Sequence, residues 1–161
     1  MPKSHNQEAL DLIDFLVKKN LGGAISLINQ LADNGINFKN FLEEILFILR
    51  KIMLQLTQPG LAEKLGLDLG ESLELRINNL SSELSLANCL RIMNRFLNLT
   101  QEKSSFIPQL PFEIAITELY LQMQSFDNKL DNKVKTNKNL IKENTVISKE
   151  KMTDSSNIIA A

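Results

Sequence analysis

Apolar residues between Phe38 and Leu56 recur at the spacing that places them on one face of an α-helix. The recurring positions are Phe38, Phe41, Leu42, Ile45, Leu49, Ile52 and Leu56. A second apolar set comprises Leu46, Phe47, Met53 and Leu54, which leaves a narrow polar edge of Lys39, Glu43, Arg50 and Lys51. We therefore predict a central helix that neighbouring helices cover on most of its circumference. It carries two acids and three bases, which excludes a membrane span of about 20 predominantly apolar residues.

Two shorter helices are predicted before the central one. The first has apolar residues at Leu10, Ile13, Phe15, Leu16 and Val17, and the second at Ala24, Ile25, Leu27, Ile28, Leu31 and Ala32. Gly22 and Gly23 would permit a sharp reversal between them, so that the two form a hairpin. Gly35 stands where a glycine often ends a helix. Asn37 is the expected N-cap of the central helix.

The second half of the chain predicts three more helices. Glu71 to Leu80 can form one between loops. Ser85 caps the next, whose apolar face is predicted to be Leu86, Cys89, Leu90, Met93, Phe96 and Leu97. Pro111, a favoured first helical residue, opens the last, with a stripe at Phe112, Ala115, Ile116, Leu119, Met123 and Phe126. No stretch alternates with period two, so we predict an all-α fold, a single bundle of five or six helices.

The charge pattern divides the chain after Phe126. Residues 1–126 contain 11 Lys and Arg and 14 Asp and Glu, a net charge of -3. Residues 127–161 contain 7 Lys and 5 acids, a net charge of +2, and no aromatic residue. A segment of this kind lacks the apolar surface that a core needs. We expect a flexible lead at 1–8, a helical domain at 9–126, and a disordered linker or tail at 127–161.

Composition limits the functions that the chain can have. Cys89 is the single cysteine and indicates a reducing compartment, and MPKSHNQEAL lacks the apolar core of a signal peptide, so we expect a cytoplasmic protein. A slightly acidic body argues against a dominant nucleic-acid surface. The run of Lys133, Lys135, Lys138 and Lys142 could neutralise phosphates, but without stacking aromatics a solvated linker is favoured.

Few residues are candidates for catalysis or metal binding. His5, the only histidine, is expected to be solvated in the flexible lead. Cys89 lies on an apolar stripe, where a buried cysteine acts as a small hydrophobe. Glu43 and Glu44 are adjacent, so they do not face one another on a helix. No phosphate-binding lysine loop, GxGxxG or HExxH motif occurs. We therefore predict no catalytic residue, no metal, no cofactor and no binding of ATP.

The order of these landmarks resembles the third, collar domain of the gamma and tau subunits of the bacterial DNA polymerase III clamp loader. Four stretches carry the resemblance: ALDLIDFLVKKNLGGAISLINQLADNGINFKNFLEEILFILRKIMLQL at Ala9 to Leu56, LTQPGL at Leu56 to Leu61, CLRIMNRFLNLTQEK at Cys89 to Lys103, and PQLPFEIAITELYL at Pro108 to Leu121. Together they cover most of Ala9 to Phe126. The last is the most specific.

The resemblance implies a non-catalytic oligomerisation domain in DNA replication. In that family the domain assembles gamma/tau copies with the delta and delta-prime subunits into a ring that loads the sliding clamp. The ATPase elements and zinc-binding cysteines of the family belong to upstream modules and are not in this sequence. Any contact of this domain with DNA would be weak or indirect. A helical adaptor or regulator unrelated to replication remains the alternative.

The last helix predicts where association would occur. Ile114 and Leu121 lie about one heptad apart on a flank, with Tyr120 nearby, and an apolar flank often marks a partner surface. Arg91 and Arg95, one turn apart on the preceding helix, could form a charged rim around it. Glu113 matches the acid that opens the final collar helix of the family. It could act across subunits or, equally, stabilise the free N–H groups of its own first turn.

Overall fold

The computed structural model describes residues 4–103 and 105–159, and over these ranges it contains seven α-helices and no strand. The helices are α1 (Asn6–Val17), α2 (Leu21–Asp33), α3 (Phe38–Thr57), α4 (Leu61–Lys64), α5 (Glu71–Glu83), α6 (Leu86–Leu99) and α7 (Leu110–Ile159). The all-α prediction is confirmed. Apart from the single turn α4, the six helices occur where the apolar pattern predicts them, and α7 continues beyond Phe126.

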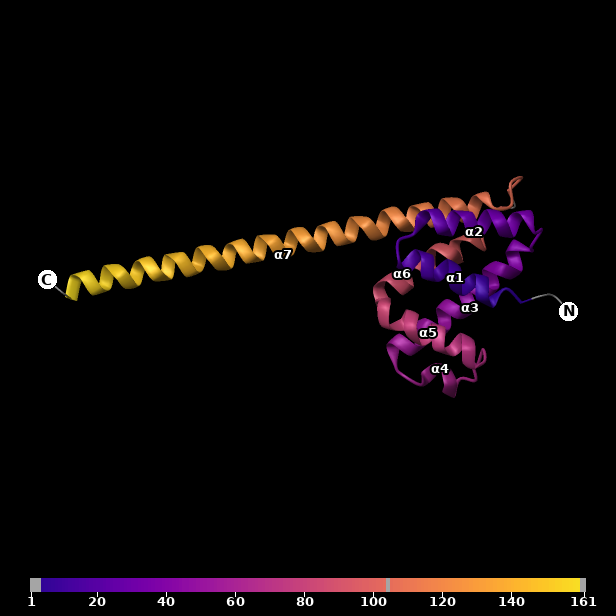
Figure 1. Cartoon of the computed structure of the whole chain (residues 1–161), viewed down its shortest axis with the longest axis horizontal. Coiled ribbons are helices and arrows are strands. Elements are labelled where there is room, and N and C mark those ends of the chain that lie inside the picture. Colours follow the sequence, from indigo (N-terminus) through magenta and orange to yellow (C-terminus); the bar gives the residue numbers. More distant parts are fainter. Residues whose placement is uncertain (1–3, 104, 160–161) are drawn as a thin grey trace. The chain divides into compact units, whose positions relative to one another are not determined.

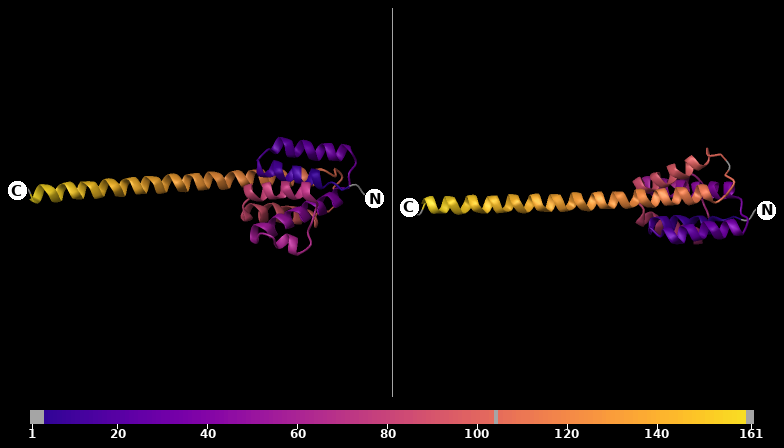
Figure 2. Two further views of the ribbon diagram at one scale, coloured as in Figure 1. Left: turned by 60° about the horizontal axis from the view of Figure 1, so that its bottom comes forward. Right: turned by 90° about the horizontal axis from the view of Figure 1, so that it is seen from above.

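Helix α3 lies at the centre of the compact unit formed by Met1–Leu121. It packs against α1, α4, α5 and α6. Figures 1 and 2 show α2 at one side of this unit and α4 and α5 at the other, with α1, α3 and α6 between them. Seven residues of α3 are buried: Phe41, Leu42, Ile45, Ile48, Leu49, Lys51 and Ile52. The predicted central helix is therefore confirmed.

Side chains at the helix starts explain why the helices begin where they do. Asn37 Oδ1 accepts hydrogen bonds from the backbone N–H groups of Lys39 and Asn40. Ser85 Oγ accepts one from the N–H of Asn88. Each bond satisfies a donor that has no partner within the helix. Gly35 has a φ of 66°, as expected for a glycine that ends a helix.

The N-terminal lead is shorter than predicted. Helix α1 begins at Asn6, and the N–H of His5 donates a hydrogen bond to Glu44 Oε2 on α3 at 2.8 Å. The side chain of His5 is 20% exposed, so the prediction of a solvated tail residue is wrong. Glu44 therefore ties the start of α1 to the central helix. A contact across 39 residues of sequence leaves no trace in local periodicity.

Gly23 is needed for close packing rather than for the reversal between α1 and α2. The reversal lies at Lys19, whose φ is 57°, and at Asn20, whose Oδ1 caps α2 by accepting from the N–H of Gly23. Gly22 and Gly23 belong to the first turn of α2. A Cβ on Gly23 would stand 2.8 Å from a ring carbon of Phe15. Glycine is therefore required where the two helices approach each other.

The sequence predicts that Lys51 lies on the polar edge of the central helix, but the structure places it in the core. Its side chain is 1% exposed, and its ammonium donates to Glu74 Oε1 on α5 and to the backbone oxygen of Leu67. Glu74 Oε1 also accepts from the N–H of Leu69 at 3.0 Å. A buried charge is tolerated when it is paired and hydrogen-bonded in this way. The pair joins the central helix to α5 and to the loop before it.

The buried face of α6 is turned relative to the prediction. Cys89, Ile92, Phe96 and Leu99 are buried. Leu86, Leu90 and Leu97, predicted to face the core, are 40%, 40% and 44% exposed. We call these three residues the α6 leucine stripe. Because α6 is apolar over more than half of its circumference, periodicity alone does not decide which part is buried.

Helix α7 belongs to the first unit only over its beginning. Phe112, Ala115, Ile116, Leu119 and Met123 are buried, whereas Phe126, predicted for the same stripe, is 47% exposed. The second unit starts at Gln122, five residues before the predicted boundary. The backbone is helical to Ile159, and every side chain from 124 to 142 is exposed. As predicted, the described side chains beyond Phe126 contribute nothing to the core.

Candidate functional site

The exposed side of α7 carries the predicted apolar pair. Ile114 is 46% exposed and Leu121 57%. Both line a shallow depression together with Glu113, Thr117 and Glu118. The buried residues of α7 lie on the opposite side of the helix. We call Ile114 and Leu121 the α7 apolar face. Tyr120 is half-buried and does not line the depression.

The acids at the two edges of this depression hold α7 against its neighbours. On one edge, Glu113 Oε1 accepts a hydrogen bond from Asn29 Nδ2 of α2 at 2.6 Å. On the other edge, Glu118 Oε2 accepts from Arg95 Nε of α6 at 2.5 Å. Charge-assisted bonds of this kind are stronger than those between neutral groups. The α7 apolar face is therefore presented by a helix that is fixed on both sides.

The structure brings one of the two predicted rim arginines to this face. Arg95 is 15% exposed and also donates to Glu102 Oε1 at 3.1 Å, so two acids hold its guanidinium. Through Glu118, Arg95 borders the depression. Arg91 instead donates to Asn88 Oδ1, one turn earlier on α6, at 2.6 Å. Of the predicted site residues, Glu113, Ile114, Leu121 and Arg95 gather at one surface, and Arg91 and Tyr120 lie outside the depression.

The α6 leucine stripe is a second exposed apolar surface, which sequence reasoning assigned to the core. Leu86, Leu90 and Leu97 follow one another at intervals of four and seven residues, so they form one line along α6. The signal was present in the sequence. Ile92 and Leu99 are apolar too, and the helix therefore has more apolar positions than one buried face requires. Surplus apolar surface of this kind marks an interaction site more often than chance.

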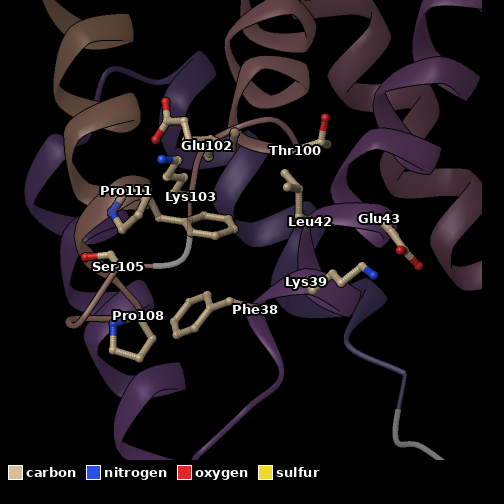
Figure 3. Close-up of a pocket in the computed structure, with 12 residues that line it drawn as sticks. Phe38, Lys39, Leu42, Glu43, Thr100, Glu102, Lys103, Ser105, Pro108 and Pro111 are labelled. Carbon is tan, nitrogen blue, oxygen red and sulfur yellow. The ribbon is translucent and has the colours of Figure 1, made fainter.

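A pocket of about 440 Å³ opens where the start of α3 meets the end of α6 and the loop that follows. Its apolar lining includes Phe38, Leu42, Leu99, Pro108, Pro111 and Phe112. Figure 3 shows Pro108 and Pro111 on the same side as Phe38, with Lys39 and Glu43 at the opposite edge. The ring of Phe112 lies 5.0 Å from that of Phe38, centroid to centroid. The lining contains no histidine or cysteine.

Cys89, the only cysteine of the sequence, is a packing residue in the core. Cys89 is buried, and desolvation raises the pKa of its thiol from 9.0 to about 11. Its Sγ donates to the backbone oxygen of Leu49 at 3.7 Å. A thiol so far from ionisation is a poor nucleophile. Within residues 4–103 and 105–142, whose side chains the structure describes, no three His, Cys, Asp or Glu side chains gather as a metal site requires.

No helix in the described part of the chain is long and apolar enough to cross a membrane.

Comparison with known proteins gives one result that bears on function. The model of a protein family described as DNA polymerase III subunits gamma and tau, domain III, matches residues 4–128. The matched range covers all of α1 to α6 and the packed beginning of α7. No curated protein matches the chain.

Proposed function

Since the chain belongs to the family of domain III of DNA polymerase III gamma and tau subunits, we propose that it is an oligomerisation domain of the clamp loader. In this proposal it assembles gamma/tau copies with the delta and delta-prime subunits for sliding-clamp loading in DNA replication. Its own contribution is protein association in the cytoplasm, without catalysis.

The α7 apolar face is the observation that carries the proposal. Burial of Ile114 and Leu121 by a partner would remove apolar surface from water at roughly 25 cal/mol per Å². The helix that carries them is held in place by Asn29 on one side and Arg95 on the other. A surface that is already rigid loses little conformational freedom on binding. The polar edge and apolar centre follow the usual anatomy of an interface.

The test is association of the full chain with itself and with purified delta and delta-prime. Light scattering gives the mass, and a pull-down gives the retention of each partner. We expect a mass above that of the monomer and retention of at least one partner. Leu121→Glu should weaken association because it places a charge in the centre of the apolar face. Leu75→Glu is the matched control, since Leu75 is 64% exposed on α5, away from this face.

The outcomes separate the proposal from its alternative. Leu121→Glu should keep the helicity and melting temperature of the wild type, because its side chain is already exposed. Unchanged association of this variant would remove the α7 apolar face from the proposal. A wild-type chain that stays monomeric and retains neither delta nor delta-prime would overturn the proposal and favour a helical adaptor outside the clamp loader.

A further inference from the structure

The part of α7 in the second unit, which starts at Gln122, carries an apolar stripe of its own. Phe126, Leu130, Val134 and Ile141 are 47%, 61%, 52% and 65% exposed. Successive residues turn by about 100° around an α-helix, so these four lie within about 80° of one another. We call them the α7 extension stripe. A straight apolar line along one side of a helix is the seam through which it packs against a second helix.

The charged residues beside this stripe are arranged unevenly. One flank, about 60° to 120° from Leu130 around the helix, begins with acids and ends with bases. Its exposed members are Asp127, Asp131, Lys138 and Lys142. Residues four apart are neighbours on a helix, so Asp127 lies beside Asp131, and Lys138 lies beside Lys142. Like charges at this spacing destabilise a single helix, and a second helix of complementary charge would offset the repulsion.

A second copy in antiparallel orientation has the complementary charges. The two acids and the two lysines are placed symmetrically about a point midway between residues 134 and 135. In an antiparallel pair the same flanks meet, so Asp127 of one copy lies opposite Lys142 of the other. The same register sets Asp131 opposite Lys138. Each pairing occurs twice, and opposite charges across a contact favour that orientation over others.

The apolar residues agree with the same register. Leu130 of one copy lies beside Ile141 of the other, and Val134 lies beside Asn137. Asn137 is the one polar residue on the line of the stripe between Val134 and Ile141. A single polar residue in such a seam selects one register at some cost in stability. The apolar and the charged positions therefore specify one arrangement independently of each other.

A parallel pair lacks this match. There each flank meets the opposite flank of the other helix, about five positions further along. Within residues 122–142, the opposite flank contains Lys129 and Lys133 and no acid. A parallel pair would therefore set Lys133 against Lys138 of the other copy, at two places. In the antiparallel pair Lys133 faces Leu140 instead, and its aliphatic stem can cover that side chain.

We infer that the α7 extension stripe pairs with the same stripe of a second copy of this chain, in antiparallel orientation. The contact is isologous, so it joins two copies and then is closed. It uses neither the α7 apolar face nor the α6 leucine stripe, and it goes beyond the proposed function. Four apolar side chains per copy form a small interface, so we expect pairing at near-millimolar concentration and little of it at micromolar concentration.

Reversal of the charges at either end of the flank tests this arrangement. Asp127→Lys with Asp131→Lys makes the flank wholly basic, and Lys138→Glu with Lys142→Glu makes it wholly acidic. We expect each double variant alone to raise the dissociation constant for pairing by about tenfold or more, since opposite charges become like charges at every contact. An equal mixture of the two should pair as strongly as the unreversed chain, because all contacts are complementary again.

The full chain is used throughout. Every member of the series also carries Leu121→Glu, so that the α7 apolar face does not contribute. Sedimentation velocity from micromolar to near-millimolar concentration measures the pairing, and circular dichroism with thermal melting checks that each variant is folded. Leu130→Glu should weaken pairing by removing an apolar contact. Lys135→Glu is the matched control, since Lys135 lies about 140° from Leu130 around the helix and should leave pairing unchanged.

Three results would overturn the inference. One is an unreversed chain that stays monomeric up to near-millimolar concentration. Another is a mixture that pairs no better than its two components. The third is a wholly acidic variant that pairs more strongly alone, which would indicate a parallel pair in which its acids meet Lys129 and Lys133. None of the three touches the proposed function, which depends on self-association and retention of delta and delta-prime by the chain with Leu121 intact.

Discussion

Glu113 Oε1 on α7 accepts a hydrogen bond from Asn29 Nδ2 on α2 at 2.6 Å, across 84 residues of sequence. The sequence allowed two roles for this acid, stabilisation of its own helix start or contact across subunits. The structure gives it a tertiary role within one molecule. Asn29 Nδ2 also donates to the backbone oxygen of Ile25 at 3.0 Å, so both hydrogens of this amide nitrogen have a partner. The bond orients the first turn of α7, from which Ile114 projects.

Loss of this bond should lower stability without abolishing association. We expect Glu113→Ala and Asn29→Ala each to reduce the free energy of unfolding by about 1.5 to 3 kcal/mol, the range for a hydrogen bond to a charged group. The double variant should cost less than the sum, because both changes remove the same contact. Urea unfolding measures all three. Glu63→Ala, an exposed acid on α4, is the control. Strict additivity would show that the two side chains do not interact in solution.

Substitution of the two members of the Lys51–Glu74 pair should lower the stability by unequal amounts. Glu74→Ala leaves the ammonium of Lys51, which is 1% exposed, without its counter-charge, and breaking a buried pair in this way costs about 3 to 5 kcal/mol. Lys51→Met should cost less, because Glu74 is 24% exposed and keeps its bond from the N–H of Leu69. Chemical unfolding gives the order. A larger loss for Lys51→Met than for Glu74→Ala would contradict the burial of the lysine.

The parts of the fold that local chemistry determines could be predicted from the sequence. Helix α3 has apolar residues on one face over five turns, and its start has an asparagine whose side chain can cap only the residues that follow it. The same holds for Ser85 and α6. Among the site residues, Ile114 and Leu121 were predictable because the opposite side of α7 already had a complete apolar stripe. Two faces of one helix that both contain large apolar residues imply two partners.

The parts that depend on distant contacts could not be predicted. Lys51 reads as a surface residue because its partner, Glu74, lies 23 residues away on another helix. The buried face of α6 depends on where α3 and α7 lie, and both Leu97 and Leu99 are suitable core residues until those positions are known. Asn29 likewise gives no local signal that it meets Glu113. In each case the deciding contact joins segments whose spacing in sequence follows no period.

The centre of α3 should carry much of the stability of the first unit. Leu49 is fully buried, and we expect Leu49→Ala to cost about 2 to 5 kcal/mol, as other large-to-small core changes do. His5→Ala should cost less than about 1 kcal/mol, because the contact of His5 with Glu44 uses the backbone N–H, which alanine keeps. Thermal melting compares the two variants. Equal losses would show that the imidazole itself supports α1.

The segment after Phe126 should exchange its amide hydrogens much faster than α3. Its described side chains, from 127 to 142, are all exposed, and a helix without tertiary contacts is marginal in water. Hydrogen exchange followed by mass spectrometry compares peptides from 127–142 with peptides from α3 in the same sample. Slow exchange throughout 127–142 at micromolar protein would contradict the expectation. Slow exchange that appeared only when the protein associates would indicate that assembly covers this segment.

Burial of Cys89 predicts a loss of stability at alkaline pH. Desolvation raises the pKa of the thiol to about 11 in the folded chain, from 9.0 in the absence of burial. Below about pH 9 the thiol is protonated in both states and the stability due to this group is fully present. Between about pH 9 and 11 the unfolded chain releases the proton while the folded chain retains it, so the unfolded state is favoured increasingly. The full loss is about 2 to 3 kcal/mol.

Comparison with Cys89→Ala isolates this effect, because the two proteins differ only in this side chain. The difference in free energy of unfolding between wild type and variant should be constant from pH 6 to 8 and should shrink towards pH 11, as only the wild type loses the contribution of a protonated thiol. In addition, the native thiol should react with a disulfide reagent at pH 8 far more slowly than the thiol in urea, since the thiolate is the reactive form and the side chain is fully buried. A constant difference up to pH 11 together with rapid labelling of the native protein would place Cys89 in contact with solvent and contradict its position against Leu49.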